Sequence, residues 1–175
     1  EVLSEAKPDV AGSGAERTID PRNAFIMTSM MKDVIAYGTA TRAQSLKRRD
    51  LAGKTGTTND NIDAWFCGFN ADQVGVSWIG FDQPRTLGTN ETGAVAALPI
   101  WISYMQRALK GVPETPLSPP DGVVSLRINA ESGLRDDSSN LSDYFYSEFT
   151  PRSRDDGLTA PTPTRSPQEV RDQIF

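Results

Sequence analysis

Three short apolar segments joined by turns constrain the fold more than any other feature of the sequence. Residues 51–58, 64–69 and 74–81 are the candidate strands, and turn-forming residues at 58–61 and 70–73 separate them. Strands that follow one another across such short loops pair antiparallel. The run at 64–69 is apolar without interruption, which is typical of a central strand. The sequence therefore predicts an antiparallel meander with the second strand in the middle.

Helical patterns lie on both sides of this meander. Asp20 followed by Pro21 predicts a helix start, with the Asp side chain as the cap and the proline in the first turn. Apolar residues then recur at helical spacing until Gly38, and a second helix is expected over 95–109 with Pro99 near its beginning. Helices that flank an antiparallel sheet make an α+β fold. The expected buried stripe of the first helix is Ile26, Met27, Met30, Met31, Val34 and Ile35.

Changes in composition divide the chain into four parts. Residues 1–111 contain the predicted sheet and helices, and residues 112–122 form a Pro-rich linker. Alternating apolar and polar residues after the linker predict a small β-hairpin module over 123–150. Residues 151–175 are rich in Pro, Thr, Ser and charged residues, so we expect a mobile tail.

The lack of histidine excludes several catalytic classes. Without histidine, neither a Ser-His-Asp nor a Cys-His mechanism is available, and a zinc site is not expected. The net charge of −5 argues against a nucleic acid partner. The single cysteine, Cys67, lies in an apolar strand and is expected to be a small buried hydrophobe. We predict no metal, no cofactor and no membrane-spanning segment within the chain.

Residues 54–57, Lys-Thr-Gly-Thr, give the first strand its chemical character. Thr55 and Thr57 alternate along the strand, so their hydroxyls point to the same face. Gly56 allows another backbone to approach closely, so an extended peptide would be able to pair with this strand. The peptide carboxylate would meet both hydroxyls and the ammonium of Lys54, and the backbone N–H of Thr57 would donate to an oxyanion. For the triplet alone, an ordinary edge strand with a solvated lysine is the favoured interpretation.

The residues around the triplet are far more specific than the triplet itself. They are 52–60 (Ala-Gly-Lys-Thr-Gly-Thr-Thr-Asn-Asp), 63–69 (Asp-Ala-Trp-Phe-Cys-Gly-Phe) and 78–82 (Trp-Ile-Gly-Phe-Asp). Together they closely resemble the transpeptidase domain of class A penicillin-binding proteins. The resemblance covers about residues 1–150, and it implies that 1–111 are the C-terminal portion of that domain, with the fold of penicilloyl-serine transferases. Further landmarks of the same family are similar to segments 23–39, 97–101 and 122–124.

The resemblance implies a reaction, partners and a location. The reaction is acyl transfer through a serine ester, in which a D-alanyl-D-alanine peptide stem of peptidoglycan loses its last D-alanine and acylates an amine of a neighbouring strand. β-Lactams acylate the same serine. Lys54 corresponds to the lysine of the family's third motif, with Thr55, Gly56 and Thr57 as substrate-binding residues. The implied location is the periplasmic face of the bacterial inner membrane, with a membrane anchor and a glycosyltransferase domain upstream.

Two other strings match family motifs by their letters alone. The family needs Ser-x-x-Lys, which carries the nucleophile, and Ser-x-Asn, and both precede Lys-Thr-Gly in family order. Ser29 and Lys32 fit the first pattern, but Ser29 lies in the middle of an amphipathic helix. Ser138-Ser139-Asn140 fits the second pattern but follows Lys54 in a polar stretch. We therefore expect this chain to lack the nucleophile, to be inactive alone, and to need the upstream part of the same protein.

Two alternatives remain open for the same strand. A serine β-lactamase shares the third motif, although the extension at 56–60 and the linker and module after Gly111 count against it. A non-catalytic interaction module that keeps the strand as a binding edge fits the missing nucleophile directly. A Ser-x-x-Lys helix and a Ser-x-Asn loop upstream of Glu1 would identify the enzyme.

Overall fold

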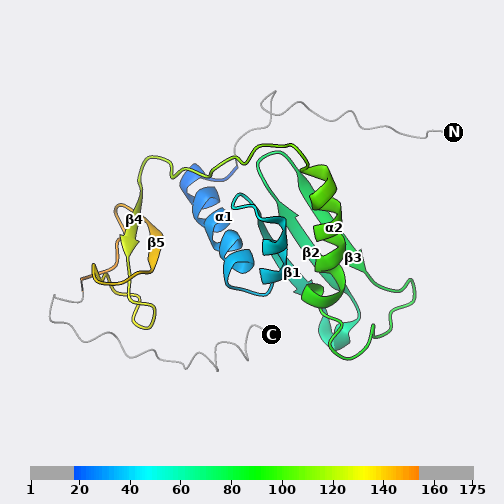
Figure 1. Ribbon diagram of the computed structural model, residues 1–175. Coiled ribbons are helices and arrows are strands. Elements are labelled where there is room, and N and C mark those ends of the chain that lie inside the picture. The colour runs from blue at the N-terminus through cyan, green and yellow to red at the C-terminus, as the bar shows by residue number, and fades with distance from the viewer. Residues whose placement is uncertain (1–17, 154–175) are drawn as a thin grey trace. The chain divides into compact units, whose positions relative to one another are not determined.

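The computed structural model describes residues 18–153, which fall into two compact units (Figure 1). The first unit extends to Pro120 and the second begins at Asp121. Residues 1–17 and 154–175 lie outside the described part, and with them most of the tail that its composition predicts to be mobile. None of the helices within residues 18–153 has the length and apolar character that a membrane span requires.

The first unit contains the predicted antiparallel meander. Strands β1 (Ala52–Thr57), β2 (Ala64–Phe69) and β3 (Val74–Ile79) pair in the order β1-β2-β3, so β2 is central as predicted. A short 3-10 turn, η2 (Asn59–Asn61), connects β1 to β2. Asp60 in this turn has a φ of 57°, a left-handed conformation that Asn and Asp tolerate better than most residues.

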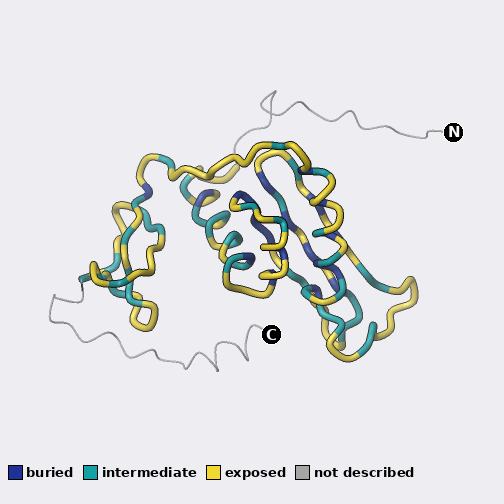
Figure 2. Tube along the Cα trace, viewed as in Figure 1, coloured by how far each residue is buried: buried dark blue, intermediate teal, exposed yellow. Residues whose placement is uncertain are grey.

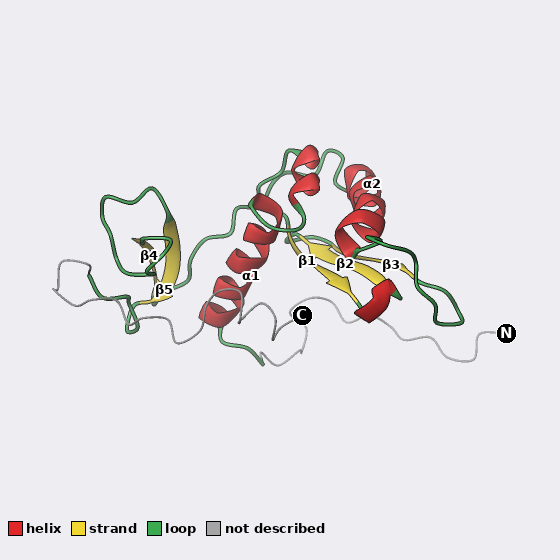
Figure 3. Cartoon of the chain, turned by 90° about the horizontal axis from the view of Figure 1, so that it is seen from below, coloured by secondary structure: helices red, strands yellow, loops and turns green. Residues whose placement is uncertain are grey.

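The two predicted helices flank this sheet. Helix α1 (Pro21–Ala36) begins as expected, because the Asp20 side chain accepts a hydrogen bond from the Arg22 N–H at 2.8 Å. Helix α2 (Leu98–Ala108) carries its proline in the first turn and follows a π-helical turn, η3 (Gly93–Ala97). Figure 3 shows α2 over one face of the sheet and α1 alongside β1. A 3-10 helix, η1 (Thr41–Leu46), lies between α1 and β1 in the chain.

The core between α2 and the sheet is organised around Trp101. Gly53, Gly68 and Gly75 stand opposite one another across the three strands, and Gly68 and Gly75 leave room for its indole ring. A Cβ at Gly68 would lie 2.6 Å from Cζ2 of Trp101. The indole N–H donates to the Gly68 carbonyl at 3.3 Å, and the ring meets Phe66 edge to face at 4.9 Å between centroids. Buried residues accordingly follow the strands and the sheet-facing side of α2 (Figure 2).

The opposite face of the sheet is open within the described residues, and this corrects one expectation. Cys67 was expected to be buried, but it is exposed. Side chains of β2 alternate between the two faces, and only the face with Ala64 and Phe66 is covered by helices. Trp65 on the open face is 37% exposed and lies 5.7 Å from Trp78, centroid to centroid. A continuous apolar run therefore does not guarantee burial on both faces here.

The buried stripe of α1 is narrower than its periodicity predicts. Phe25 and Ile35 are buried, but Met27 and Met30 are 47% and 55% exposed. The helix contacts β1 and η1 along one side, so part of its apolar surface has no covering element among residues 18–153.

The second unit is a small two-stranded sheet. Strands β4 (Val123–Arg127) and β5 (Ser142–Tyr146) pair antiparallel. A turn over residues 129–133 follows β4, where the Asn129 side chain accepts hydrogen bonds from the backbone N–H groups of Glu131 and Ser132. The partner strand does not follow that turn directly, since residues 134–141 intervene.

Candidate functional site

Strand β1 forms an edge of the three-stranded sheet. It pairs with β2 alone among the strands of the described residues, so its second edge has no strand partner there. Lys54 and Thr57 are exposed, and Thr55 and Gly56 are half-buried. An edge strand with accessible side chains is the geometry that a peptide needs in order to add to a sheet.

The polar side chains of β1 divide between its two faces. Thr55 is paired with Phe66, so it shares the helix-covered face with Thr57, as alternation predicts. Lys54 is paired with Cys67 and therefore lies on the open face. Its ammonium donates to the backbone carbonyl of Thr55 at 3.1 Å. The strand thus carries two hydroxyls on one side and the charge on the other, with Gly56 between them.

The Thr55 hydroxyl has a protein partner that the sequence did not reveal. Its Oγ1 lies 2.8 Å from Oγ1 of Thr39, in the turn that follows α1. The two residues are separated by 16 positions, and either hydroxyl is able to donate. The contact ties the end of α1 to the middle of β1.

The Thr57 hydroxyl also has a partner, again distant in sequence. It accepts a hydrogen bond from the backbone N–H of Gly93 at 3.0 Å, at the start of η3. Gly93 approaches β1 and β2 so closely that a Cβ there would lie 2.5 Å from the Gly56 carbonyl oxygen and 2.3 Å from that of Trp65. Glycine is needed at position 93 because any side chain would push η3 away from the strand.

The turn after β1 is closed by a compact set of hydrogen bonds. The Thr58 hydroxyl accepts from the Asp63 N–H at 2.7 Å, and the Asp63 carboxylate accepts from the indole N–H of Trp78 at 2.8 Å. Asn61 then anchors the loop before η3, because its carbonyl accepts from Leu87 and its side-chain amide donates to the Gly88 carbonyl. These contacts fix the C-terminal end of β1.

A nearly buried ion pair fixes the other end of β1. Arg48 donates to both carboxylate oxygens of Asp50, at 2.9 and 2.6 Å, and the two side chains are 11% and 2% exposed. The same guanidinium donates to the carbonyls of Val112 and Pro113, and the Asn70 amide donates to Asp50. The start of the predicted linker and the β2–β3 turn are therefore tied to the residues that precede β1.

Asp50 is charged at neutral pH because its hydrogen bonds outweigh its burial. Burial raises the pKa of the Asp50 carboxyl, but hydrogen bonds from Arg48, Asn70 and the Thr115 N–H hold the pKa below its usual value. The hydrogen bond to Asp50 likewise raises the pKa of Arg48 above its ordinary value. Both partners therefore keep their charges throughout the neutral range.

The two segments that match Ser-x-x-Lys and Ser-x-Asn by their letters alone are distant from β1 in sequence and belong to different parts of the structure. Ser29 is in the interior of α1 and is half-buried. Ser138, Ser139 and Asn140 belong to the second unit, where the Ser138 hydroxyl and N–H both bond to the Asp136 carboxylate.

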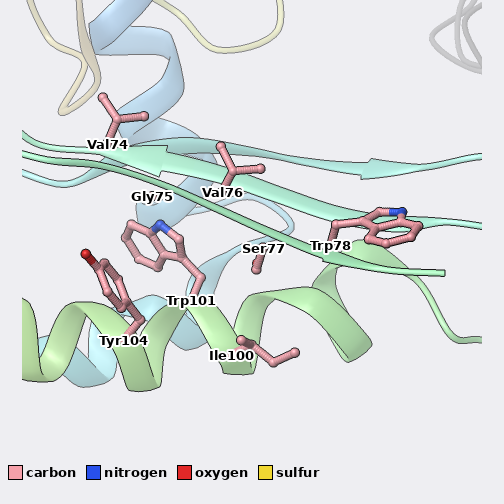
Figure 4. Close-up of a pocket in the computed structure, with 8 residues that line it drawn as sticks. All are labelled: Val74, Gly75, Val76, Ser77, Trp78, Ile100, Trp101 and Tyr104. Carbon is pink, nitrogen blue, oxygen red and sulfur yellow. The ribbon is translucent and has the colours of Figure 1, made fainter. Parts of the chain in front are cut away.

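A cavity of about 460 Å³ lies between β3 and α2, at the sheet edge away from β1 (Figure 4). Val76 and Trp78 of β3 and Ile100 and Tyr104 of α2 line it, together with the indole of Trp101. It contains none of residues 54–57, so it is not the place where the polar groups of β1 would act.

Comparisons with known proteins give a consistent relationship. No protein-family model matches the chain. Penicillin-binding protein 1A of Pseudomonas aeruginosa is 55% identical over 133 residues, which are 76% of this chain and 16% of that protein. The protein of the same name from Neisseria lactamica is 52% identical over 122 residues, 70% of this chain and 15% of that protein. The chain thus spans about one sixth of the length of these relatives.

A solved structure supports the same relationship. The crystal structure of penicillin-binding protein 1A from Haemophilus influenzae matches 79% of this chain with a TM-score of 0.75 and 38% sequence identity, over 22% of its own length. Sequence and structure therefore agree with the resemblance found around Lys54, and the α+β fold with its antiparallel sheet is the one expected. The chain belongs to the class A penicillin-binding proteins, of which it represents part of the transpeptidase region.

Proposed function

We propose that this chain supplies the Lys-Thr-Gly wall of a D,D-transpeptidase active site, which cross-links peptidoglycan and is acylated by β-lactams. The observation that carries the proposal is the arrangement of β1: an edge strand with the exposed Lys54 and with two hydroxyls, Thr55 and Thr57, that are each held by a second residue. The identity of 52–55% to penicillin-binding protein 1A supports the same assignment.

Each residue of the motif has a distinct task in this proposal. An extended stem peptide, or a β-lactam in its place, lies along the free edge of β1, where Gly56 permits close approach. The hydroxyls of Thr55 and Thr57 donate to its carboxylate, a charge-assisted interaction. The ammonium of Lys54 lies on the other face and acts at the serine side of the cleft, where it attracts the anionic substrate. The backbone N–H of Thr57 donates to the oxyanion that forms on the scissile carbonyl.

The reaction needs a second wall. In the proposed chemistry a serine oxygen attacks the carbonyl of the penultimate D-alanine, and the last D-alanine leaves as its amine with the serine proton. An amine of a neighbouring stem then attacks the ester, the ester C–O bond breaks, and the released serine oxygen takes up the proton that the amine loses. We place that serine in a separate segment of the same protein, upstream of this chain, which carries Ser-x-x-Lys and Ser-x-Asn. The chain is then the C-terminal part of the domain and is inactive alone. The complete protein would act at the periplasmic face of the inner membrane through an upstream anchor.

Labelling with a fluorescent penicillin tests this proposal. In the protein that carries both walls, peptide mapping is expected to place the covalent adduct on a serine outside residues 1–175. The isolated chain is expected to remain unlabelled, because neither Ser29 nor Ser138 is positioned as a nucleophile. An adduct on either of these serines would refute the proposed division of the site between two segments.

A further inference from the structure

Thr39 is the one side chain outside the Lys-Thr-Gly motif that bonds directly to a motif hydroxyl within the described residues. We infer that Thr39 is a positioning residue, which donates to Thr55 and so directs the Thr55 proton to the carboxylate of the bound ligand. The inference rests on the function proposed above and assigns a role to a residue outside its motif.

The backbone around Thr39 is held firmly enough to position a hydroxyl. The N–H groups of Tyr37 and Gly38 both donate to the Asp33 carbonyl, and the Ala40 N–H donates to the Val34 carbonyl. Ala40 is fully buried beside Thr39. The turn also closes tightly on α1, because a Cβ at Gly38 would lie 2.9 Å from Cα of Val34. The Thr39 hydroxyl is therefore fixed by the end of α1 and not by a flexible loop.

The count of protons determines the direction of the hydrogen bond. Each threonine hydroxyl has one proton to donate and two lone pairs to accept with. In the Thr39–Thr55 pair without ligand, either oxygen is able to donate across the 2.8 Å. A carboxylate next to Thr55 accepts only, so it takes the Thr55 proton, and Thr39 must then be the donor to Thr55. Hydrogen bonds in such a chain polarise one another, which strengthens the bond to the carboxylate.

Thr57 has the same arrangement with a backbone donor. The N–H of Gly93 donates to the Thr57 oxygen, so the Thr57 proton remains available for a ligand. Both motif hydroxyls therefore have a protein group behind them that occupies a lone pair. Only the Thr39 contact comes from a side chain, so a substitution is able to remove it without altering the backbone.

Acylation kinetics of the protein that carries both walls of the site test this role. Thr39→Val keeps the β-branched shape but removes the hydroxyl. We expect the second-order rate constant for acylation by benzylpenicillin to fall about fivefold, the factor for one lost hydrogen bond, mainly through weaker initial binding. Thr39→Ser restores a hydroxyl and should recover most of the rate. Thr28→Val removes a hydroxyl that donates to the Ala24 carbonyl within α1, and this variant should be acylated at the wild-type rate.

Two further measurements separate a role at the carboxylate from a general structural effect. The methyl ester of benzylpenicillin lacks the anionic acceptor, so Thr39→Val should change its acylation rate less than twofold. In a Thr55→Val background the Thr39→Val substitution should have no further effect, since Thr39 acts through Thr55.

The outcomes distinguish this inference from the function on which it rests. A wild-type protein that no penicillin acylates would refute the proposed function and the role of Thr39 with it. If the wild-type protein is acylated normally, two results for Thr39→Val would overturn the role of Thr39 alone. One is an unchanged acylation rate with benzylpenicillin, and the other is an equal loss of rate with benzylpenicillin and with its methyl ester. Independent, additive effects of Thr39→Val and Thr55→Val would overturn it as well.

Discussion

The guanidinium of Arg48 binds both carboxylate oxygens of Asp50, two residues before β1 begins, and the same guanidinium holds the carbonyls of Val112 and Pro113. Val112 and Pro113 are 64 and 65 positions away from Arg48 in sequence, yet the ion pair is adjacent to the proposed substrate-binding strand. The ion pair thereby connects the residues that precede β1 to the residues that follow α2.

Removal of one partner of this pair should destabilise the first unit. Asp50→Asn removes the carboxylate that is hydrogen-bonded to the nearly buried Arg48, so we expect a loss of about 3 kcal/mol in the free energy of unfolding. All three tryptophans lie in the first unit, so urea unfolding followed by tryptophan fluorescence reports on it. Asp20→Asn is the matched control, because its pair with Arg22 is exposed and Asn caps helices as well as Asp. Equal effects of the two substitutions would contradict the assigned role.

The contribution of Asp50 should depend on pH in one direction. Its pKa is lowered in the folded state, so its stabilisation is complete above the unfolded pKa of about 3.9 and is lost as the pH falls through the folded value. The difference in unfolding free energy between the wild type and Asp50→Asn should therefore be constant near neutrality and shrink below about pH 4. Urea midpoints measured across that range test this, and a difference that stays unchanged in acid would disagree with it.

Gly68, which lies beneath the Trp101 ring, should not tolerate a methyl group. Gly68→Ala would place its Cβ 2.6 Å from the Trp101 ring and 2.7 Å from Phe66, so overpacking should cost about 1–3 kcal/mol of stability. Val74→Thr on the open face, where Val74 is 75% exposed, should change stability by less than about 0.5 kcal/mol. Thermal or urea unfolding of both variants is the measurement. A Gly68→Ala variant as stable as the wild type would mean that Trp101 packs differently.

Gly93 should matter for acylation through Thr57. Gly93→Ala would bring a methyl group against the carbonyl oxygens of Trp65 and Gly56, so η3 must shift and its N–H must leave the Thr57 hydroxyl. We expect acylation by penicillin to slow by about fivefold or more, the effect of one lost hydrogen bond with added displacement. Gly133→Ala in the second unit is a control for acylation. Normal kinetics in Gly93→Ala would show that this hydrogen bond does not support the site.

Local patterns explain which parts of the fold the sequence predicts. The order of β1, β2 and β3 follows from apolar segments and turn residues that are adjacent in the chain. The start of α1 follows from Asp20 and Pro21, whose effects on a helix are also local. The exposure of Cys67 could not be predicted in the same way, because a run of apolar residues does not show which face of a strand other elements cover.

The sequence predicts the residues of the candidate site on β1, but not the residues that form hydrogen bonds to them. Alternation along β1 correctly places Thr55 and Thr57 together, and the same alternation puts Lys54 on the opposite face. Thr39 and Gly93 were not identified because they lie 16 and 36 positions away from their partners, and no local periodicity relates such positions. The sequence around Thr39 indicates the end of a helix and resembles a family landmark, but neither feature indicates a contact with β1.

The acylation rate of Lys54→Ala shows whether β1 supplies the third motif of a penicillin-acylated site. In the protein that carries both walls of the site, the second-order rate constant with a fluorescent penicillin should fall by at least about a hundredfold, because the substitution removes the charged group that we propose acts on the ligand and the nucleophile. Lys32→Ala is the matched control. Lys32 and Ser29 match the Ser-x-x-Lys pattern by their letters, but we assign no catalytic role to either residue. We expect slow acylation of Lys54→Ala and acylation of Lys32→Ala at the wild-type rate. Unchanged acylation in Lys54→Ala, or a loss confined to Lys32→Ala, would contradict this expectation.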